Sequence, residues 1–188
     1  MTLLLLACAT PEPVASTPVE RPEVVPEVVL PSAKADLRMK RWRQLSLDLQ
    51  GALELTPDQI CKEMGLYDCM TLHTVPLGGL SVENGLFQAS QELTVTTSLA
   101  VERVVLNACA TRLDLDLQLE EPVVFFLDPH EAQVTELYQR LLARDPAEEE
   151  AQVLLDFHGP VLDEGGDTAS WALLSCFMVG SSTEALLY

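Results

Sequence analysis

Basic residues are scarce in this 188-residue chain, which has 11 lysines and arginines against 29 aspartates and glutamates and a formal charge of −18. We therefore expect no nucleic-acid partner, because binding phosphates needs clustered Lys and Arg. Long apolar runs are also missing: the longest candidate, residues 171–179, is well short of the roughly 18 residues of a membrane-spanning helix. Since 48% of the residues are apolar, the chain is not wholly disordered.

The chain also lacks the motifs that mark common catalytic and cofactor sites. It has no G-x-S-x-G elbow, no glycine-rich phosphate loop and no H-E-x-x-H motif. Cys69 and His73 lack the second cysteine of a C-x-x-C-H haem attachment motif. A zinc site with Cys61 would lack ligands, because the chain has only three histidines. The sequence predicts no metal and no cofactor.

The N-terminus has the features of an exported lipoprotein. Residues 1–8 end in Leu5-Leu6-Ala7-Cys8, which resembles a bacterial lipobox, where signal peptidase cuts before a cysteine that carries the lipid. The apolar region before it is short and has no basic residues ahead of it, so we expect the true start codon to lie upstream. The alternative is an accidental Leu-Leu-Ala-Cys. Ala9, rather than an aspartate, follows, which resembles lipoproteins sent to the outer membrane.

Residues 9–33 form a proline-rich linker that holds six of the 12 prolines. Proline fixes φ and lacks an N–H, so polyproline II or disorder is predicted here. At about 3.1 Å per residue, such a tether reaches up to roughly 75 Å. Residues 34–188 would then be a single folded body held off a membrane. Most of the negative charge is in this body, since residues 44–188 carry five basic and 24 acidic side chains, a balance of −19.

The body is predicted to be mainly α, a single helical domain with a minor β element. Apolar residues recur every three or four positions over residues 39–53, which indicates an amphipathic helix. Thr56-Pro57-Asp58-Gln59 is a capping box that predicts a short helix ending at Gly65. Residues 70–75 are expected to be extended. Ser98 is expected to cap a helix that runs to about Arg112.

Beyond that helix, Leu113–Leu119 alternates strictly between apolar and polar residues, which is the period of a strand. The run is expected either to form a hairpin or edge element with residues 123–127 or to be an extended connection that lies over the helices. The short apolar run Val123–Leu127 is also β-prone. Asp128-Pro129 and Asp145-Pro146 each predict a helix start. A final helix over residues 171–179 is apolar on most sides and is expected at the centre of the core.

The last third resembles a helical module of exported proteins. Leu137-Tyr138-Gln139-Arg140-Leu141-Leu142-Ala143-Arg144-Asp145-Pro146, with Glu149 following, fits an LYxxLLxRxPxxxE helix–turn–helix, and a Trp171-Ala172 helix and the closing residues 182–188 complete it. Similar signatures occur in uncharacterised exported proteins of myxobacteria and planctomycetes, so the chain resembles a myxobacterial-type lipoprotein. The resemblance implies helices and export. The haem motif of the cytochrome-like members is absent here, so electron transfer does not carry over.

Four cysteines remain once the lipid-bearing Cys8 is set aside. In an oxidising compartment an even count favours disulfides, and four cysteines allow three pairings. We favour Cys61–Cys69, which closes a short loop, together with Cys109–Cys176, which ties a middle helix to the last one. Alternatively, Cys109 and Cys176 are simply buried apolar residues.

Two weak candidate sites contain titratable residues. His73 lies in a glycine-flanked loop with Glu83 and Glu92, and a histidine with a carboxylate can perform acid–base catalysis. The better interpretation is an ordinary core or surface histidine. A group of acids (Asp114, Asp116, Glu120, Glu121 and Asp128) suggests calcium, but leucines separate the first two and no glycine follows, so a solvated strand face is favoured.

Together these features predict a membrane-anchored lipoprotein of the cell envelope, attached to the outer membrane. We expect it to act as a non-enzymatic structural or interaction module that contacts another envelope protein. The alternative is an exported enzyme or redox accessory with its site near His73.

Overall fold

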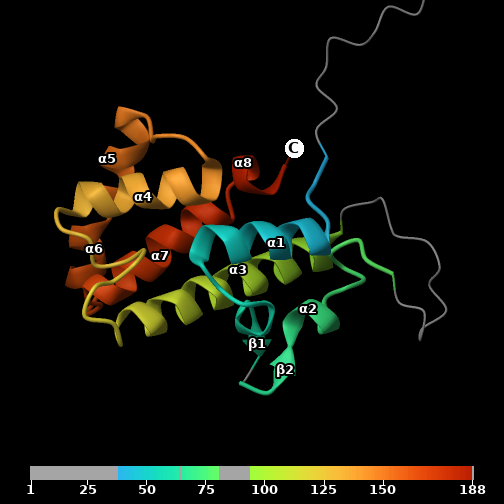
Figure 1. Cartoon of the computed structure of the whole chain (residues 1–188). Coiled ribbons are helices and arrows are strands. Elements are labelled where there is room, and N and C mark those ends of the chain that lie inside the picture. Colours follow the sequence, from blue (N-terminus) through green and yellow to red (C-terminus); the bar gives the residue numbers. More distant parts are fainter. Residues whose placement is uncertain (1–37, 64, 81–93, 188) are drawn as a thin grey trace, which may run out of the picture. The chain divides into compact units, whose positions relative to one another are not determined.

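The computed structural model describes residues 38–63, 65–80 and 94–187. The chain divides into two compact units, residues 1–35 and residues 36–188, and all described residues belong to the second. Cys8 and the proline-rich linker lie outside the described residues. The described body is mainly helical, as predicted (Figure 1).

The elements follow one another along the body in a helix-rich order. They are α1 (Trp42–Leu53), the 3₁₀ turn η1 (Pro57–Gln59), β1 (Lys62–Glu63), β2 (Tyr67–Asp68), α2 (Cys69–Leu72), α3 (Val95–Asp116), α4 (His130–Leu142), α5 (Glu148–Asp156), α6 (His158–Asp163), α7 (Thr168–Gly180) and α8 (Thr183–Leu186). The antiparallel pair β1–β2 is a minimal hairpin, with Lys62 opposite Asp68. Its turn contains Gly65 at φ 71°, a left-handed conformation that suits glycine.

The core is built around α7, which packs against α3, α4 and α6. Trp171 of α7 is fully buried, and its Nε1–H donates a 2.8 Å hydrogen bond to the carbonyl of Leu154. At the other end of α7, an added Cβ on Gly180 would lie 2.9 Å from Val105 Cγ1 of α3. The absence of a side chain at Gly180 therefore lets these two helices approach closely. The expectation that this apolar helix is central to the core is confirmed.

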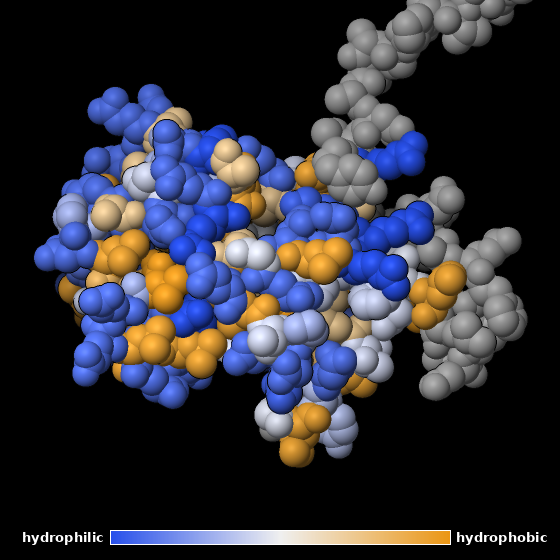
Figure 2. Space-filling view, viewed as in Figure 1, coloured by the Kyte–Doolittle hydropathy of each residue, from blue (hydrophilic) through white to orange (hydrophobic). Residues whose placement is uncertain are grey.

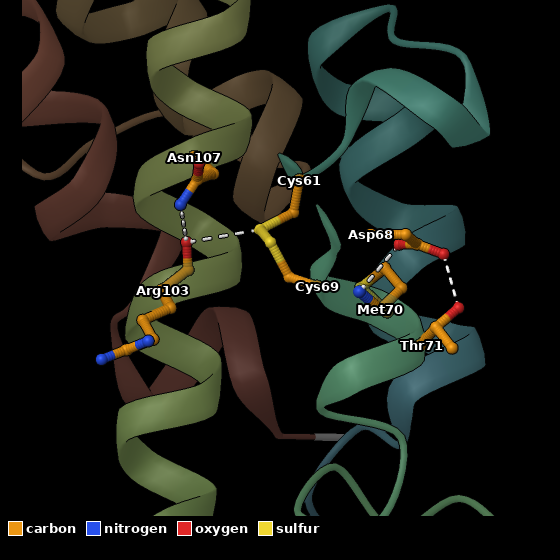
Figure 3. Close-up of a disulfide and its surroundings, with 7 residues drawn as sticks. All are labelled: Cys61, Asp68, Cys69, Met70, Thr71, Arg103 and Asn107. Atoms are coloured by element: carbon orange, nitrogen blue, oxygen red, sulfur yellow. Dashed lines mark hydrogen bonds between the residues drawn. A yellow bond between two sulfur atoms is a disulfide. The ribbon is translucent and has the colours of Figure 1, made fainter. Parts of the chain in front are cut away.

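Two disulfides brace the body, and they join the same pairs that the sequence favoured. Cys109–Cys176 ties α3 to α7 with 6.0 Å between the Cα atoms, and Cys61–Cys69 closes the β1–β2 hairpin with 5.3 Å between them. Cys61 Sγ also lies 3.9 Å from the carbonyl oxygen of Arg103, so this end of the hairpin contacts α3 (Figure 3). All four cysteines are at most 2% exposed. Both bridges are thus shielded from thiols in solution.

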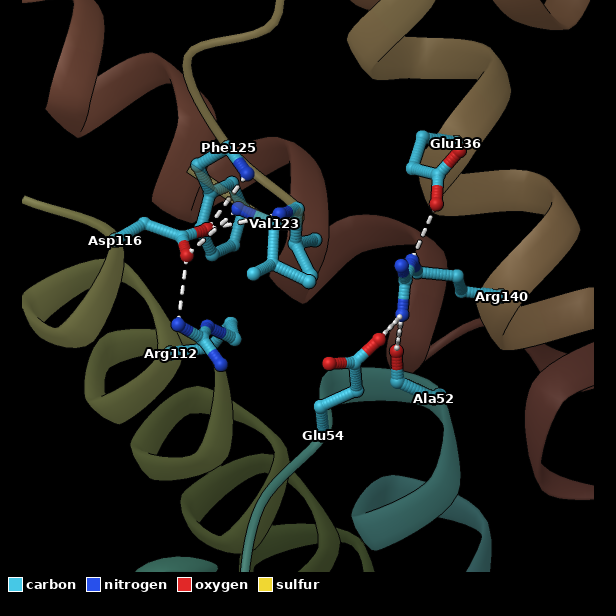
Figure 4. A network of polar contacts seen from close by, with 9 residues as sticks. Ala52, Glu54, Arg112, Asp116, Val123, Phe125, Glu136 and Arg140 are labelled. Atoms are coloured by element: carbon cyan, nitrogen blue, oxygen red, sulfur yellow. Dashed lines mark hydrogen bonds and ion pairs between the residues drawn. The ribbon is translucent and has the colours of Figure 1, made fainter. Parts of the chain in front are cut away.

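The strand predicted over Leu113–Leu119 is wrong, because α3 continues to Asp116. The Asp116 carboxylate is buried and accepts a 2.7 Å ion-pair hydrogen bond from Arg112 one helical turn earlier. The same carboxylate accepts backbone N–H groups of the following loop, from Val123 at 3.0 Å, Val124 at 2.9 Å and Phe125 at 2.8 Å (Figure 4). A single carboxylate therefore ends α3 and fixes the loop that leads to α4.

Four smaller predictions are also corrected. The helix expected from Pro57 to Gly65 is the single 3₁₀ turn η1 followed by the hairpin. Residues 70–75 are helical and then turn rather than extended, because Asp68 caps α2 by accepting the N–H of Met70 at 2.9 Å. The run Val123–Leu127 forms no strand, since Asp116 takes up its first N–H groups. The α3 helix also starts four residues earlier than expected, with Thr94 rather than Ser98 as its N-cap.

Contacts between charged side chains hold α4 against α1. Arg140 of α4 donates to Glu54 at 2.9 Å and to the carbonyl of Ala52 at 3.3 Å at the end of α1, and it also pairs with Glu136 (Figure 4). The surface on the side shown in Figure 2 is largely hydrophilic, with apolar residues in separate groups. One group lies over the β1–β2 hairpin, where Leu66 is 78% exposed.

Candidate functional site

Of the three residues proposed for acid–base chemistry, only His73 lies within the described part of the structure. His73 is half-buried at the C-cap of the short helix α2, where its backbone N–H donates to the carbonyl of Cys69 at 2.7 Å. Glu83 and Glu92 lie outside the described residues, as does Cys8. The acid–base hypothesis for His73 therefore stays a prediction.

The five acidic residues considered for calcium binding differ in burial. Asp116 is buried in its ion pair, whereas Asp114, Glu120, Glu121 and Asp128 are exposed. Within residues 38–63, 65–80 and 94–187, no group of three or more His, Cys, Asp and Glu side chains is arranged to hold a metal ion. The alternation does not place these residues on one strand face, because they belong to a helix and a loop.

The structure instead shows a hollow between α4, α5, α7 and α8, which we call the Met178 hollow. Its volume is about 260 Å³, and its wall is mainly apolar, formed by Leu142, Val153, Leu154, Met178 and Val179. Val153 is 60% exposed and Met178 is 41% exposed, so these two side chains present apolar surface to solvent. A dry cavity of about 150 Å³ holds a benzene molecule, and typical cofactor pockets begin at about 300 Å³. The Met178 hollow therefore suits one or two side-chain-sized groups.

The polar edge of the Met178 hollow is an ion-pair network centred on Arg144. This arginine forms two hydrogen bonds with Glu150 of α5, at 2.7 and 2.8 Å, and two with Glu184 of α8, at 2.7 and 2.6 Å. A further N–H donates to the carbonyl of Asp145 at 3.0 Å. All five donors of the guanidinium are thus used. Its face also lies over the ring of Tyr138, 5.2 Å from the centroid.

This network shifts the pKa values of its members. The hydrogen bonds from Arg144 lower the pKa of Glu150 to about 2 and also lower the pKa of Glu184, while the two carboxylates raise the pKa of Arg144. Burial and then the nearby charge of Glu150 raise the pKa of Tyr138. Near neutral pH the network thus holds one positive and two negative charges. The guanidinium joins the α4–α5 turn to α5 through Glu150 and to α8 through Glu184.

A second cluster brings together two histidines that are distant in sequence. The rings of His130 and His158 lie 4.7 Å apart between centroids, and both contact Trp171, at 4.9 and 5.1 Å. Within the described residues, the buried Nε2 of His158 has no hydrogen-bond partner. His158 directly follows Phe157, the C-cap of α5, and begins α6, and its ring packs against the core tryptophan.

Neither cluster was anticipated from the sequence. The acidic run at the start of α5 places negative charge at the positive end of the helix dipole, and Glu150 also accepts the N–H of Ala147 at 2.8 Å there. Its stronger partner is Arg144 on the preceding turn, and Glu184 joins from 40 residues further along. Only the local capping of α5 by Glu150 has a signal in the sequence, the acidic run itself.

The fold and the site define a mainly helical domain, braced by two disulfides, with a small apolar hollow beside a charged network. No helix in the described part of the chain is long and apolar enough to cross a membrane. No family model, curated protein or solved structure matches the chain.

Proposed function

We propose that the protein is a membrane-anchored lipoprotein of the bacterial cell envelope, whose body acts as a non-enzymatic interaction module. The observation that carries the interaction role is the Met178 hollow, where exposed Val153 and Met178 border an apolar depression. Apolar side chains grouped at a concave surface are typical of sites that receive a partner. The anchor rests on Cys8 and its lipobox, and the linker of residues 9–33 supplies the distance from the membrane.

Both disulfides support export to an oxidising compartment, because buried bridges of this kind persist there and are rare in a reducing cytosol. Stable attachment to a membrane takes more than one acyl chain, and the tri-acylated cysteine that a lipobox implies meets this requirement. The outer membrane is the proposed location, because Ala9 follows the lipid-bearing cysteine.

The anchor is tested by growing cells with radioactive palmitate and isolating the protein. Wild type should carry label and sediment with membranes, and Cys8→Ala should lose both properties. A wild-type protein that is soluble and unlabelled would refute the anchor.

The interaction role is tested by photocrosslinking in native membranes. A photoreactive benzoylphenylalanine replaces Val153 at the Met178 hollow, and in a control it replaces Leu162, which is 43% exposed on α6 and does not line the hollow. We expect a discrete crosslinked band at position 153 that the control at position 162 lacks. Identical patterns from both positions would argue against a binding role for the hollow.

A further inference from the structure

We propose that the Met178 hollow receives an apolar side chain of a partner protein that is flanked by lysine or arginine. This inference rests on the proposed interaction role and specifies the chemistry of the partner. It follows from the volume of the hollow, from the use of every Arg144 donor and from the charge around the rim.

The apolar part of the partner is set by the wall of the hollow. At about 260 Å³ the space accepts a side chain the size of Leu, Met or Phe, and the partly exposed Val153 and Met178 line it. Methionine is unbranched and polarizable, so its side chain adjusts to differently shaped apolar groups. Burial of one such group supplies the affinity, because apolar area removed from water is the main favourable contribution.

The charge of the partner follows from the Arg144 network. An anionic ligand would need free N–H donors, but Arg144 has already given all five to Glu150, Glu184 and the carbonyl of Asp145. What remains at the edge is one net negative charge, from two carboxylates and one guanidinium.

The surroundings strengthen this preference for a cation. Glu148 and Glu149 are exposed in the first turn of α5, and residues 44–188 carry a balance of −19. A partner with lysines or arginines beside its apolar residue would gain from this field, whereas an acidic segment or an anionic lipid surface would be repelled. The acidic body thus selects for basic segments that also present an apolar side chain.

The test uses the full chain and three synthetic peptides of equal length. In the first peptide a central leucine is flanked by two lysines on each side, in the second the lysines are replaced by glutamates, and in the third the leucine is replaced by serine. Binding is followed by NMR, with the Met178 methyl group as the local reporter. We expect the lysine–leucine peptide to shift this methyl with a dissociation constant of about 0.1–1 mM, weakening as salt rises. The serine peptide should bind at least about tenfold more weakly, and the glutamate peptide should cause no shift.

Two variants with the same charge change provide the control. Met178→Lys places a cation at the hollow, and Leu162→Lys places one on α6 at a side chain of nearly equal exposure, 43% against 41%. Met178→Lys should weaken binding of the lysine–leucine peptide by at least about tenfold, and Leu162→Lys should weaken it by less than about threefold. Equal effects of the two variants, or equal binding of the lysine and glutamate peptides, would overturn the proposal. A partner crosslinked at position 153 without binding of the lysine–leucine peptide would refute this chemistry and leave the interaction role standing.

Discussion

Replacing Asp116 by asparagine should destabilise the body more than the replacement of any acidic side chain that is exposed to solvent. The Asp116 carboxylate is buried and holds four partners, the guanidinium of Arg112 at 2.7 Å and the backbone N–H groups of Val123, Val124 and Phe125 at 2.8–3.0 Å. Asparagine keeps the shape but loses the charge, and its NH₂ group would face donors. The last two of these N–H groups belong to fully buried residues, so no water replaces the lost acceptor.

The expected magnitude follows from the kind of interaction that is lost. Breaking a buried ion pair by removing one partner costs about 3–5 kcal/mol, and hydrogen bonds to a charged group contribute about 1.5–3 kcal/mol each without being additive. We expect Asp116→Asn to lower the free energy of unfolding by about 3–5 kcal/mol. At about 2–4 °C per kcal/mol for a domain of this size, the midpoint of thermal unfolding should fall by about 6–20 °C.

Urea and thermal unfolding followed by circular dichroism measure this loss, with Asp114→Asn as the control. Asp114 is exposed on the same helix, so its substitution should stay within about 0.5 kcal/mol of wild type. Arg112→Met should cost less than Asp116→Asn, because Asp116 then keeps its three N–H partners. In Asp116→Asn the amides of Val124 and Phe125 should also exchange hydrogen faster. A loss below about 1 kcal/mol with unchanged protection of these amides would refute the anchoring role.

Three further predictions concern the disulfides, the charged network and the helix contact. Cys109→Ala with Cys176→Ala opens a bridge between residues 67 positions apart, and chain entropy predicts a loss of roughly 4 kcal/mol in denaturant unfolding; a loss below about 1 kcal/mol would contradict this. The Glu150 carboxyl should titrate by NMR near pH 2 rather than 4.5; because this pKa is lowered on folding, the stability it adds is full above pH 4.5 and lost as the pH falls towards 2, and a midpoint near 4.5 would disprove the pairing. Gly180→Ala should destabilise by about 1–3 kcal/mol through contact with α3, whereas Gly51→Ala, with no atom within 4 Å, should stabilise by about 0.5–1 kcal/mol; the same sign for both would refute the close approach.

Local patterns predicted those elements whose own residues carry the signal. The spacing of Leu45, Leu49 and Leu53 predicts α1, and all three are buried along one face of it. The capping box at Thr56 is present, with the side chain of Gln59 accepting the N–H of Thr56 at 2.9 Å. These features depend on neighbours within four residues, which is the range over which a helix turn imposes its spacing.

The alternation over Leu113–Leu119 shows where a local pattern misleads. Its leucines do not share a face, since Leu113 is 7% exposed whereas Leu117 is 58% exposed and Leu119 is 48% exposed. The spacing of Arg112 and Asp116 by four residues was the overlooked sign of a helix. No local pattern could show that Asp116 would be buried, because the N–H groups that compensate for its lost hydration come from a loop seven to nine residues later.

The sequence by itself determined that the body is acidic and mainly helical, because composition and the period of apolar residues depend only on the order of the side chains. It also limited the cysteines to three pairings and marked Cys8 as the candidate for lipid attachment. Only the tertiary structure decided what the acidic side chains do. It buries one carboxylate at the end of α3, and it sets Glu184 against Arg144 across 40 residues. The Met178 hollow exists because four helices meet there, and that meeting depends on packing between segments that are distant in the chain.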